Sequence, residues 1–238
     1  MSTTFSFAKL RSWLNPFEQK AFKTEHRFER KFTVPLQDID RIETLLIAHG
    51  CSPIYHPRWI NNLYCDKLDM EHLNDNVEGY SERTKLRFRW YGEAFGDIKV
   101  TAEYKDKVDD VNQKFSQKLG TFHWNNLDEI QGLFQQFEQK LINESNTLFL
   151  EVVQHQPSLL NRYLRRYYMD ATESVRVTID TDLSFYNCQT QLKHQNQEYA
   201  IVELKSPSNS PIIDDLIPLQ TSKSSKYVEG LMMTDPNF

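Results

Sequence analysis

The stretch TKLRFRWYG, residues 84–92, decides the fold because its side chains separate into two chemical classes when it is read as a β-strand. Successive side chains of a strand point to opposite faces. One face is apolar and carries Leu86, Phe88 and Trp90. The other face is cationic apart from one phenol and carries Lys85, Arg87, Arg89 and Tyr91. Two unit charges about 4 Å apart repel by about 4 kcal/mol at an effective dielectric of about 20, so a bound anion would stabilise this face.

The composition indicates a folded globular chain with no general attraction for polyanions. The chain has 238 residues, of which 39% are hydrophobic and 13% aromatic, which is enough to build a packed core. Its formal net charge of −5 excludes a global basic field that would attract nucleic acid or anionic lipid. Any cationic site must therefore be local and enclosed by the fold.

Several absent motifs narrow the class further. The three cysteines, Cys51, Cys65 and Cys188, have no CxxC or metal-ligand spacing, as is typical of a reducing cytoplasm. No apolar run approaches the roughly 18 residues of a membrane span, and no signal sequence opens the chain. No GxGxxG or GxxxxGK motif supports a Rossmann or P-loop phosphate site. We therefore expect a soluble cytoplasmic protein without a transmembrane segment and without a nucleic-acid partner.

Alternation of apolar and polar residues predicts further strands. They are residues 27–35, 58–66, 97–107, 114–120, 160–170, 174–183 and 198–205. Residues 160–170 also fit a helix, although their tyrosines favour a strand. Apolar residues at helical spacing predict helices over 36–50, 127–141 and 222–233. Residues 1–24 have a similar spacing and would lie on the body, on a partner or on a membrane surface. No internal repeat or linker divides residues 1–238, so we expect one domain.

The charged faces of these strands repeat one pattern, in which an acid and a cation are separated by one residue. The pairs are Glu29/Lys31, Glu103/Lys105 and Glu203/Lys205. Other strands contribute the arginines Arg87, Arg89, Arg165 and Arg176. The outer face of an antiparallel sheet also alternates, so a solvated surface is one interpretation. Such a surface would hold more Ser, Gln and Asn, and we favour the alternative of an enclosed ligand site.

A sheet that closes into a barrel would place the polar faces in a lumen, with the helices over 36–50 and 127–141 covering the outside. Arginine forks and lysine ammonium groups suit phosphate oxygens. Carboxylates suit Mg²⁺ or Mn²⁺. The residue chemistry therefore favours a ligand of the polyphosphate type.

Seven motifs together resemble one known family. They are RFERKF, KLRFRWYG, EYK, RRYY, VRVTIDTDL, VELK and SKSSKY, in this order between about residues 27 and 231. This set is similar to the catalytic domain of the VTC (vacuolar transporter chaperone) family, a branch of the CYTH or triphosphate tunnel metalloenzyme superfamily. The resemblance implies an α+β fold built on a closed antiparallel β-barrel, a tunnel of about eight strands with a polar lumen and helices packed outside.

The resemblance also implies an activity, namely a polyphosphate polymerase that transfers the γ-phosphate of ATP to a growing inorganic polyphosphate chain with Mn²⁺ or Mg²⁺. The implied phosphate-binding and catalytic residues are Lys31, Arg87, Arg89, Lys105, Arg165, Arg176, Lys223 and Lys226. Of these, Arg87, Arg89, Lys105, Arg165 and Arg176 would hold the nucleotide phosphates. Lys223 and Lys226 would guide the acceptor or product at a tunnel mouth. Glu203 matches the metal-binding glutamate, and Glu29 and Glu103 are further metal candidates.

Two other functions stay open: a tunnel triphosphatase that hydrolyses tripolyphosphate or a nucleoside triphosphate, and a non-catalytic module that binds polyphosphate or nucleotide. Members of the superfamily usually begin with ExExK, whereas this chain has Arg27 in place of the first acid. That replacement is typical of the VTC branch and weakens the hydrolase interpretation. It also removes one candidate metal ligand.

Some individual assignments have alternatives of their own. Arg166, next to Arg165, could be the inward arginine of its segment. Asp180 and Asp182 of IDTDL could bind metal, although we expect them to stabilise a turn. The tyrosines Tyr91, Tyr163 and Tyr167 are expected to pack rather than to stack on a base.

Overall fold

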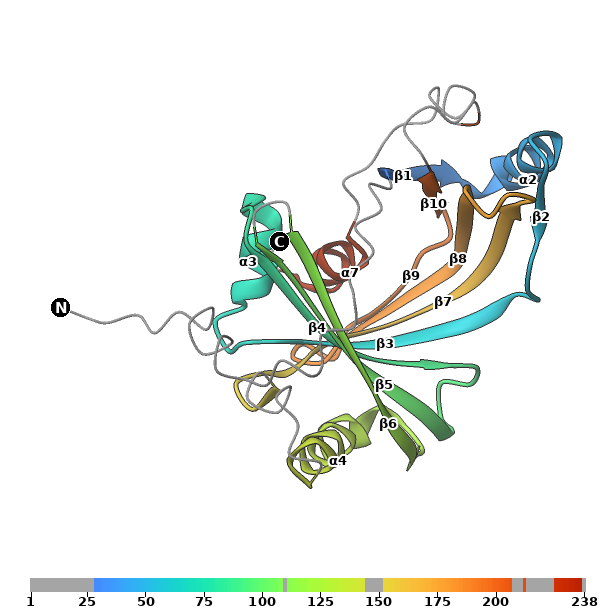
Figure 1. Cartoon of the computed structure of the whole chain (residues 1–238). Helices are drawn as coiled ribbons and strands as arrows, with labels where there is room; N and C mark the ends of the chain where they lie inside the picture. Colours follow the sequence, from blue (N-terminus) through green and yellow to red (C-terminus); the bar gives the residue numbers. More distant parts are fainter. Residues whose placement is uncertain (1–27, 109–110, 144–151, 207–211, 213–224, 237–238) are drawn as a thin grey trace, which may run out of the picture.

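The computed structural model describes residues 28–108, 111–143, 152–206, 212 and 225–236 (Figure 1). The expected N-terminal helical segment, residues 1–24, lies outside these residues. None of the helices in the described ranges is long and apolar enough to cross a membrane.

An antiparallel sheet forms the body of the protein. Its strands are β1 (Phe28–Pro35), β2 (Cys51–Pro53), β3 (Arg58–Asp66), β4 (Arg83–Tyr91), β5 (Gly96–Val108), β6 (Val111–Trp124), β7 (Gln156–Asp170), β8 (Arg176–Asn187), β9 (Lys193–Gln195) and β10 (Tyr199–Ser206). The main path runs β1-β10-β8-β7-β3-β4-β5-β6, with β2 paired to β7 and β9 paired to β8. The predicted strands are confirmed, including the ambiguous segment 160–170, which lies inside β7.

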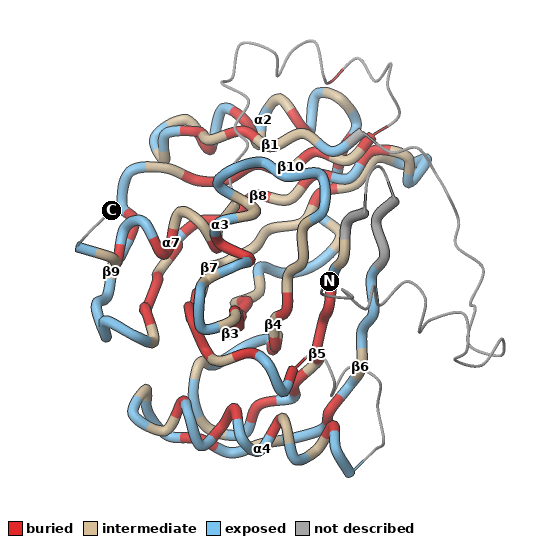
Figure 2. Tube along the Cα trace, turned by 90° about the vertical axis from the view of Figure 1, so that its left-hand side faces the viewer, coloured by how far each residue is buried: buried red, intermediate tan, exposed pale blue. Residues whose placement is uncertain are grey.

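The sheet curls strongly, and its path ends at β1 and β6. In Figure 2 the strands curve between α2 (Ile39–Ala48) at one end of the view and α4 (Ile130–Asn143) at the other. No ladder joins β1 to β6 among the residues that the structure describes. The structure is therefore α+β with a mostly antiparallel, curled sheet, and hydrogen-bonded closure of the barrel stays a prediction.

Two apolar clusters cover the outer face of the sheet, as the alternation predicts. Phe88 and Trp90 of β4 pack with Phe134 and Phe137 of α4 in one cluster. In the other, α2 contributes Ile39, Ile42 and Leu46 against apolar side chains of β1, β8 and β10. The short 3₁₀ turns η2 (Leu36–Asp38) and η3 (Leu127–Glu129) lead into these two helices. The expectation that helices pack outside the sheet is thus correct for α2 and α4.

The closing helix α7 (Lys226–Thr234) differs, because it packs on the inner face of the sheet. Tyr227 and Leu231 lie in an apolar cluster with Ile60, Tyr163 and Phe185, which belong to β3, β7 and β8. Figure 1 shows α7 between the two halves of the curled sheet. One part of the inner face is therefore apolar and filled by a helix, which the sequence pattern did not predict.

The helix α3 (Glu71–Glu78) was not among the predicted helices, because most of its residues are polar. Its first turn is capped by Asp66, the last residue of β3, whose carboxylate accepts the backbone N–H groups of His72 and Leu73. The same carboxylate accepts the Tyr227 hydroxyl of α7 at 2.5 Å. A carboxylate at a helix N-terminus is favourable because it satisfies free N–H groups. Asp66 thus joins α3, β3 and α7 at one end of the sheet.

Gly230→Ala should lower the free energy of unfolding by about 1–2 kcal/mol. An added Cβ would lie 2.4 Å from Phe185 Cδ1 and 2.6 Å from Leu159 Cδ2, an overlap that costs about 1–3 kcal/mol. The gain in helix propensity returns at most about 1 kcal/mol. Urea unfolding measures the change.

The matched control is Gly132→Ala in α4, where no atom lies within 4 Å of an added Cβ. This exposed site should gain up to about 1 kcal/mol from helix propensity alone. Equal stabilities for the two variants would contradict the placement of α7 against β7 and β8.

Candidate anion-binding site

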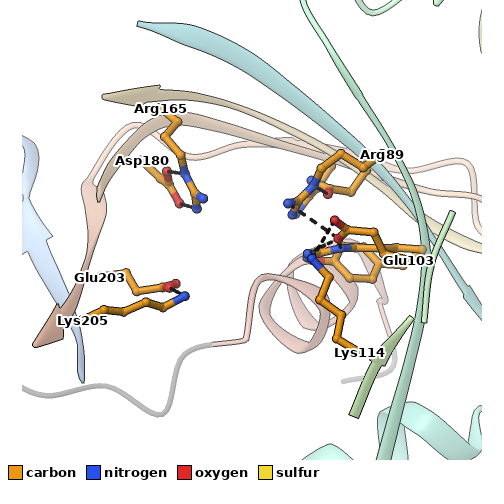
Figure 3. A network of polar contacts seen from close by, with 11 residues as sticks. Arg89, Glu103, Lys114, Arg165, Asp180, Glu203 and Lys205 are labelled. Carbon is orange, nitrogen blue, oxygen red and sulfur yellow. Dashed lines mark hydrogen bonds and ion pairs between the residues drawn. The ribbon is translucent and has the colours of Figure 1, made fainter. Parts of the chain in front are cut away.

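Charged side chains from strands along the whole sheet path share the remainder of the inner face. Directly opposed residues of an antiparallel ladder point to the same face. Lys31 of β1 lies opposite Glu203 of β10, and Asp180 of β8 lies opposite Arg165 of β7. Figure 3 shows the side chains of Arg165, Asp180, Glu203 and Arg89 pointing into one space between the strands.

The first group of contacts surrounds Glu103 of β5. Arg87 donates from Nε and Nη2 to Glu103 Oε2 at 2.8 and 2.6 Å. Lys114 Nζ lies 3.0 Å from the other carboxylate oxygen, and Arg89 Nη1 lies 3.6 Å from Oε2. Burial alone would raise the pKa of Glu103, but Arg87 and Arg89 outweigh it and lower the pKa from 4.5 to about 2. Glu103 therefore stays ionised and holds these cations in place.

Arg89 has a second support, a pair of buried asparagines. Its Nε donates to Asn62 Oδ1 at 2.8 Å, and Asn62 Nδ2 donates to Asn161 Oδ1 at 2.8 Å. Asn161 thus holds Asn62, and Asn62 fixes the orientation of the Arg89 guanidinium. Because Glu103 is shared with other cations, the charge of Arg89 is only partly offset.

The second group is the buried carboxylate of Asp180, which is 0% exposed. Arg165 donates from Nε and Nη2 to its two oxygens at 2.6 and 2.7 Å, and Lys226 Nζ lies 2.7 Å from Oδ2. Burial would raise the pKa of Asp180, but Arg165 and Lys226 outweigh it and lower the pKa from 3.8 to about 2. Lys226 is the first residue of α7, so this contact anchors that helix.

The expectation that Asp180 stabilises a turn is wrong, because Asp180 lies inside β8. The choice of Arg165 over Arg166 follows from the same ladder. Arg165 meets Asp180 on the inner face, whereas Arg166 Nη1 lies 2.5 Å from Glu43 of α2 on the outer face. Neighbouring residues of a strand point to opposite faces, which separates the two arginines.

The third group joins β1 and β10. Lys205 Nζ lies 2.8 Å from Glu203 and 3.5 Å from Glu29, and Lys31 Nζ lies 3.4 Å from Glu29. Burial would raise the pKa of Glu203, but Lys205 and Lys31 outweigh it and lower the pKa from 4.5 to about 2. Every ExK pair that the sequence singled out thus lies on the inner face.

Lys85 of β4 forms no ion pair with a carboxylate among the residues that the structure describes. Its Nζ donates to Ser225 Oγ at 3.0 Å. Burial, followed by the charges of Lys31 and Lys105, lowers its pKa from 10.5 to about 7. Burial also lowers the pKa of Lys105, where Glu29 acts in the opposite direction and Lys31 adds to the lowering. The positive charges of lysines from β1, β4 and β5 therefore repel one another across the space inside the sheet.

Among the described residues of these three groups, taken together with Lys85 and Lys105, the cations outnumber the carboxylates. The cations are Lys31, Lys85, Arg87, Arg89, Lys105, Lys114, Arg165, Lys205 and Lys226. The carboxylates are Glu29, Glu103, Asp180 and Glu203. An anion with several oxygen atoms would supply the missing counter-charge.

One of the sequence-predicted site residues, Arg176, lies at the edge of these groups. Arg176, the first residue of β8, is exposed and lies opposite Lys205, so it shares the face at its edge. Lys223 lies outside the described residues. Sequence reasoning left out Lys85 and Lys114 as site residues, although the place of Lys85 on the cationic face of residues 84–92 was a usable signal.

The carboxylates fit a divalent metal in one mode, in which the phosphates of a substrate supply the remaining ligands. In the described ranges, no group of three or more His, Cys, Asp or Glu could hold a metal ion. Glu203 and Glu29 both contact Lys205, so they lie close together, whereas Glu103 is held by Arg87 and its neighbours. Mg²⁺ is commonly bound by one or two carboxylates together with substrate phosphates. Glu203, with Glu29 beside it, fits that mode best.

One sequence family and two solved structures resemble this chain. A sequence model of the VTC domain family matches residues 26–234. No curated protein sequence matches the chain. A solved structure of a candidate adenylate cyclase from Vibrio parahaemolyticus is 11% identical, covers 86% of this chain and 98% of its own, and has a TM-score of 0.48. A candidate adenylyl cyclase from Hippeastrum with a dominant triphosphatase activity is 11% identical, with coverages of 87% and 97% and a TM-score of 0.43.

Acid should destabilise the protein between about pH 4.5 and pH 2. The pKa values of Glu103, Asp180 and Glu203 lie near 2 in the folded protein, below their ordinary values of 4.5, 3.8 and 4.5. Their stabilisation is complete above the ordinary pKa values and is lost as the pH falls through the folded ones. Urea unfolding at a series of pH values measures this loss.

Asp180→Asn should lower the free energy of unfolding at pH 7 by about 3–5 kcal/mol, because it leaves two buried cations without their carboxylate. It should also flatten the acid limb of the pH series. Asp97→Asn is the control, since Asp97 pairs with His123 on the surface, where their side chains are 77% and 61% exposed. If both variants were equally stable, Asp180 would not hold Arg165 and α7.

Proposed function

This chain belongs to the VTC domain family, and on that premise we propose that it transfers the γ-phosphate of ATP to a growing inorganic polyphosphate chain. The observation that carries the proposal is the excess of inward-facing cations, above all Lys85, whose pKa is lowered to about 7 by burial and by neighbouring lysines. Such a group gains most from an anion with many oxygens. We further propose that residues 1–238 form one domain and that the curled sheet serves as the tunnel.

In this proposal the arginines Arg87, Arg89 and Arg165 bind the phosphates of the nucleotide. Phosphoryl transfer depends mainly on positioning and on stabilising charge in the transition state. Glu103 and Asp180 hold two of these guanidinium groups by paired hydrogen bonds, and Asn62 orients the third. The arginines are therefore preorganised before a ligand binds.

The lysines Lys31, Lys85 and Lys105 continue the site, and Arg176 lies at its edge. Binding of phosphate would raise the pKa of Lys85 toward its ordinary value, so anion binding takes up protons near pH 7. No side-chain nucleophile is required, because a terminal phosphate oxygen of the acceptor attacks. Lys226 anchors α7 through Asp180, which leaves the guidance of the acceptor to Lys223.

Glu203 would hold the divalent ion, Mn²⁺ or Mg²⁺, with Glu29 as the neighbouring carboxylate. When bound, the ion offsets negative charge on the phosphate oxygens. Lys205 lies 2.8 Å from Glu203 and would then be free to contact phosphate. The free thiols Cys51, Cys65 and Cys188 suit the reducing cytoplasm that we propose as the location.

Purified protein with ATP and Mn²⁺ should produce long-chain polyphosphate, visible as a ladder on a polyacrylamide gel. Release of orthophosphate from tripolyphosphate without polymer would replace the proposal by a tunnel triphosphatase. Binding of tripolyphosphate without any turnover would replace it by a binding module. Glu203→Gln should reduce polymer formation by about 100-fold while tripolyphosphate still binds, which calorimetry without metal can measure.

A pair of adjacent arginines tests where the phosphates bind. Arg165→Ala should weaken binding of tripolyphosphate by about 10- to 100-fold, the effect of losing a charged hydrogen bond. Arg166→Ala should leave binding unchanged, because Arg166 pairs with Glu43 on the outer face. Each variant loses one ion pair, so thermal unfolding separates a change in stability from a change in binding. Equal losses of binding in the two variants would contradict the inner-face site.

A further inference from the structure

A cluster of aromatic side chains surrounds Arg58 at the end of the inner face near Arg165. Arg58 is the first residue of β3 and lies opposite Arg165 in the ladder with β7, so it shares the face of the anion site. Its guanidinium carbon lies 4.6 Å from the ring centre of Tyr55, 4.8 Å from that of Tyr167 and 5.4 Å from that of Tyr91. These distances are typical of cation–π contacts.

The charge of Arg58 is not offset by an acid. Among the residues that the structure describes, no carboxylate forms an ion pair with Arg58, and its buried Nε has no hydrogen-bond partner. This differs from Arg87 and Arg165, each of which is held by a carboxylate. The aromatic rings are thus the main partners of this guanidinium.

The rings themselves are unusually open. Tyr91 is 51% exposed and Tyr55 is 55% exposed, so Tyr91, which we expected to pack, is covered over only part of its surface. Tyr163 does pack, at 2% exposed. Tyr55 and Tyr167 meet edge to face, with ring centres 5.5 Å apart and an angle of 86°. The exposure of Tyr55 and Tyr91 leaves ring surface available to a planar ligand.

The cluster lies beside the proposed phosphate-binding arginines. Tyr91 follows Arg89 by two residues on the same face of β4, a separation of about 7 Å. Lys85 lies six residues from Tyr91 on that face, about 20 Å away. A nucleoside triphosphate placed with its phosphates on Arg89 and Arg165 would therefore bring its base to the rings.

We propose that this cluster is a nucleobase subsite, in which the base of the nucleotide substrate stacks on Tyr91 and Tyr55 beside the Arg58 guanidinium. The proposal rests on the proposed function and names the substrate as a nucleoside triphosphate rather than inorganic triphosphate. Bases stack on aromatic rings and on arginine planes. Because every base has a π-face, the subsite accepts different bases. The nucleoside then occupies the Tyr91 end, and the acceptor chain arrives from the Lys85 end.

Calorimetry in EDTA compares ATP with tripolyphosphate, so that binding is measured without turnover. Tyr91→Ala should weaken ATP binding by about 10-fold, the loss expected for one base–aromatic stack, and should leave tripolyphosphate binding unchanged. Tyr91→Phe keeps the ring and should bind ATP as the wild type does. Tyr80→Ala is the control, since Tyr80 is 58% exposed but follows α3 and is not among the rings around Arg58.

Equal losses of ATP and tripolyphosphate binding in Tyr91→Ala would overturn the proposal, because the cluster would then bind phosphate or support the fold. Unchanged ATP binding would also overturn it, leaving a cation–π cluster that only rigidifies this end. If the wild type makes polyphosphate but Tyr91→Ala does not weaken ATP binding, only the subsite is refuted. If the wild type makes no polymer but Tyr91→Ala selectively loses ATP binding, only the polymerase is refuted. Failure of the wild type to bind either ligand refutes both.

Discussion

The structure depends on one electrostatic constraint, the crowding of cations on the inner face of a curled sheet. The register of the strand pairs places Lys31, Arg89 and Arg165 on that face although their positive charges repel one another. Buried carboxylates reduce the cost, and burial makes each contact stronger than it would be in water. The carboxylates are fewer than the cations, and the positive charge that remains makes the inner face a candidate anion site.

The inner face also carries the apolar surface on which α7 packs, so a single strand can have both charged and apolar side chains on this face. In β3, Arg58 and Asn62 belong to the charged region, whereas Ile60 and Tyr64 belong to the apolar cluster with Tyr227. Asp180 connects the two regions, because it pairs with Arg165 of the site and with Lys226 of the helix. One carboxylate thereby links the stability of the fold to the proposed ligand binding.

Much of the candidate site could be predicted because strand alternation is a local property. The face of Lys85, Arg87 and Arg89 follows from three alternate residues of one strand, and the ExK pairs follow in the same way. What could not be predicted is which charges meet. Asp180 read as a turn residue because its partners, Arg165 and Lys226, come from β7 and α7. The helix α3 was missed because its capping carboxylate, Asp66, belongs to the preceding strand.

By itself, the sequence determined the sheet, its two faces and the family, because a period of two and a set of motifs are written in neighbouring residues. Only the tertiary structure decided that α7 packs on the inner face of the sheet and that Lys85 has little counter-charge. It also decided that the exposed rings of Tyr55 and Tyr91 lie beside the Arg58 guanidinium. These outcomes depend on contacts between residues far apart in the chain. Curling of the sheet brings such residues together, and electrostatic and apolar forces act on distance in space rather than on separation in sequence.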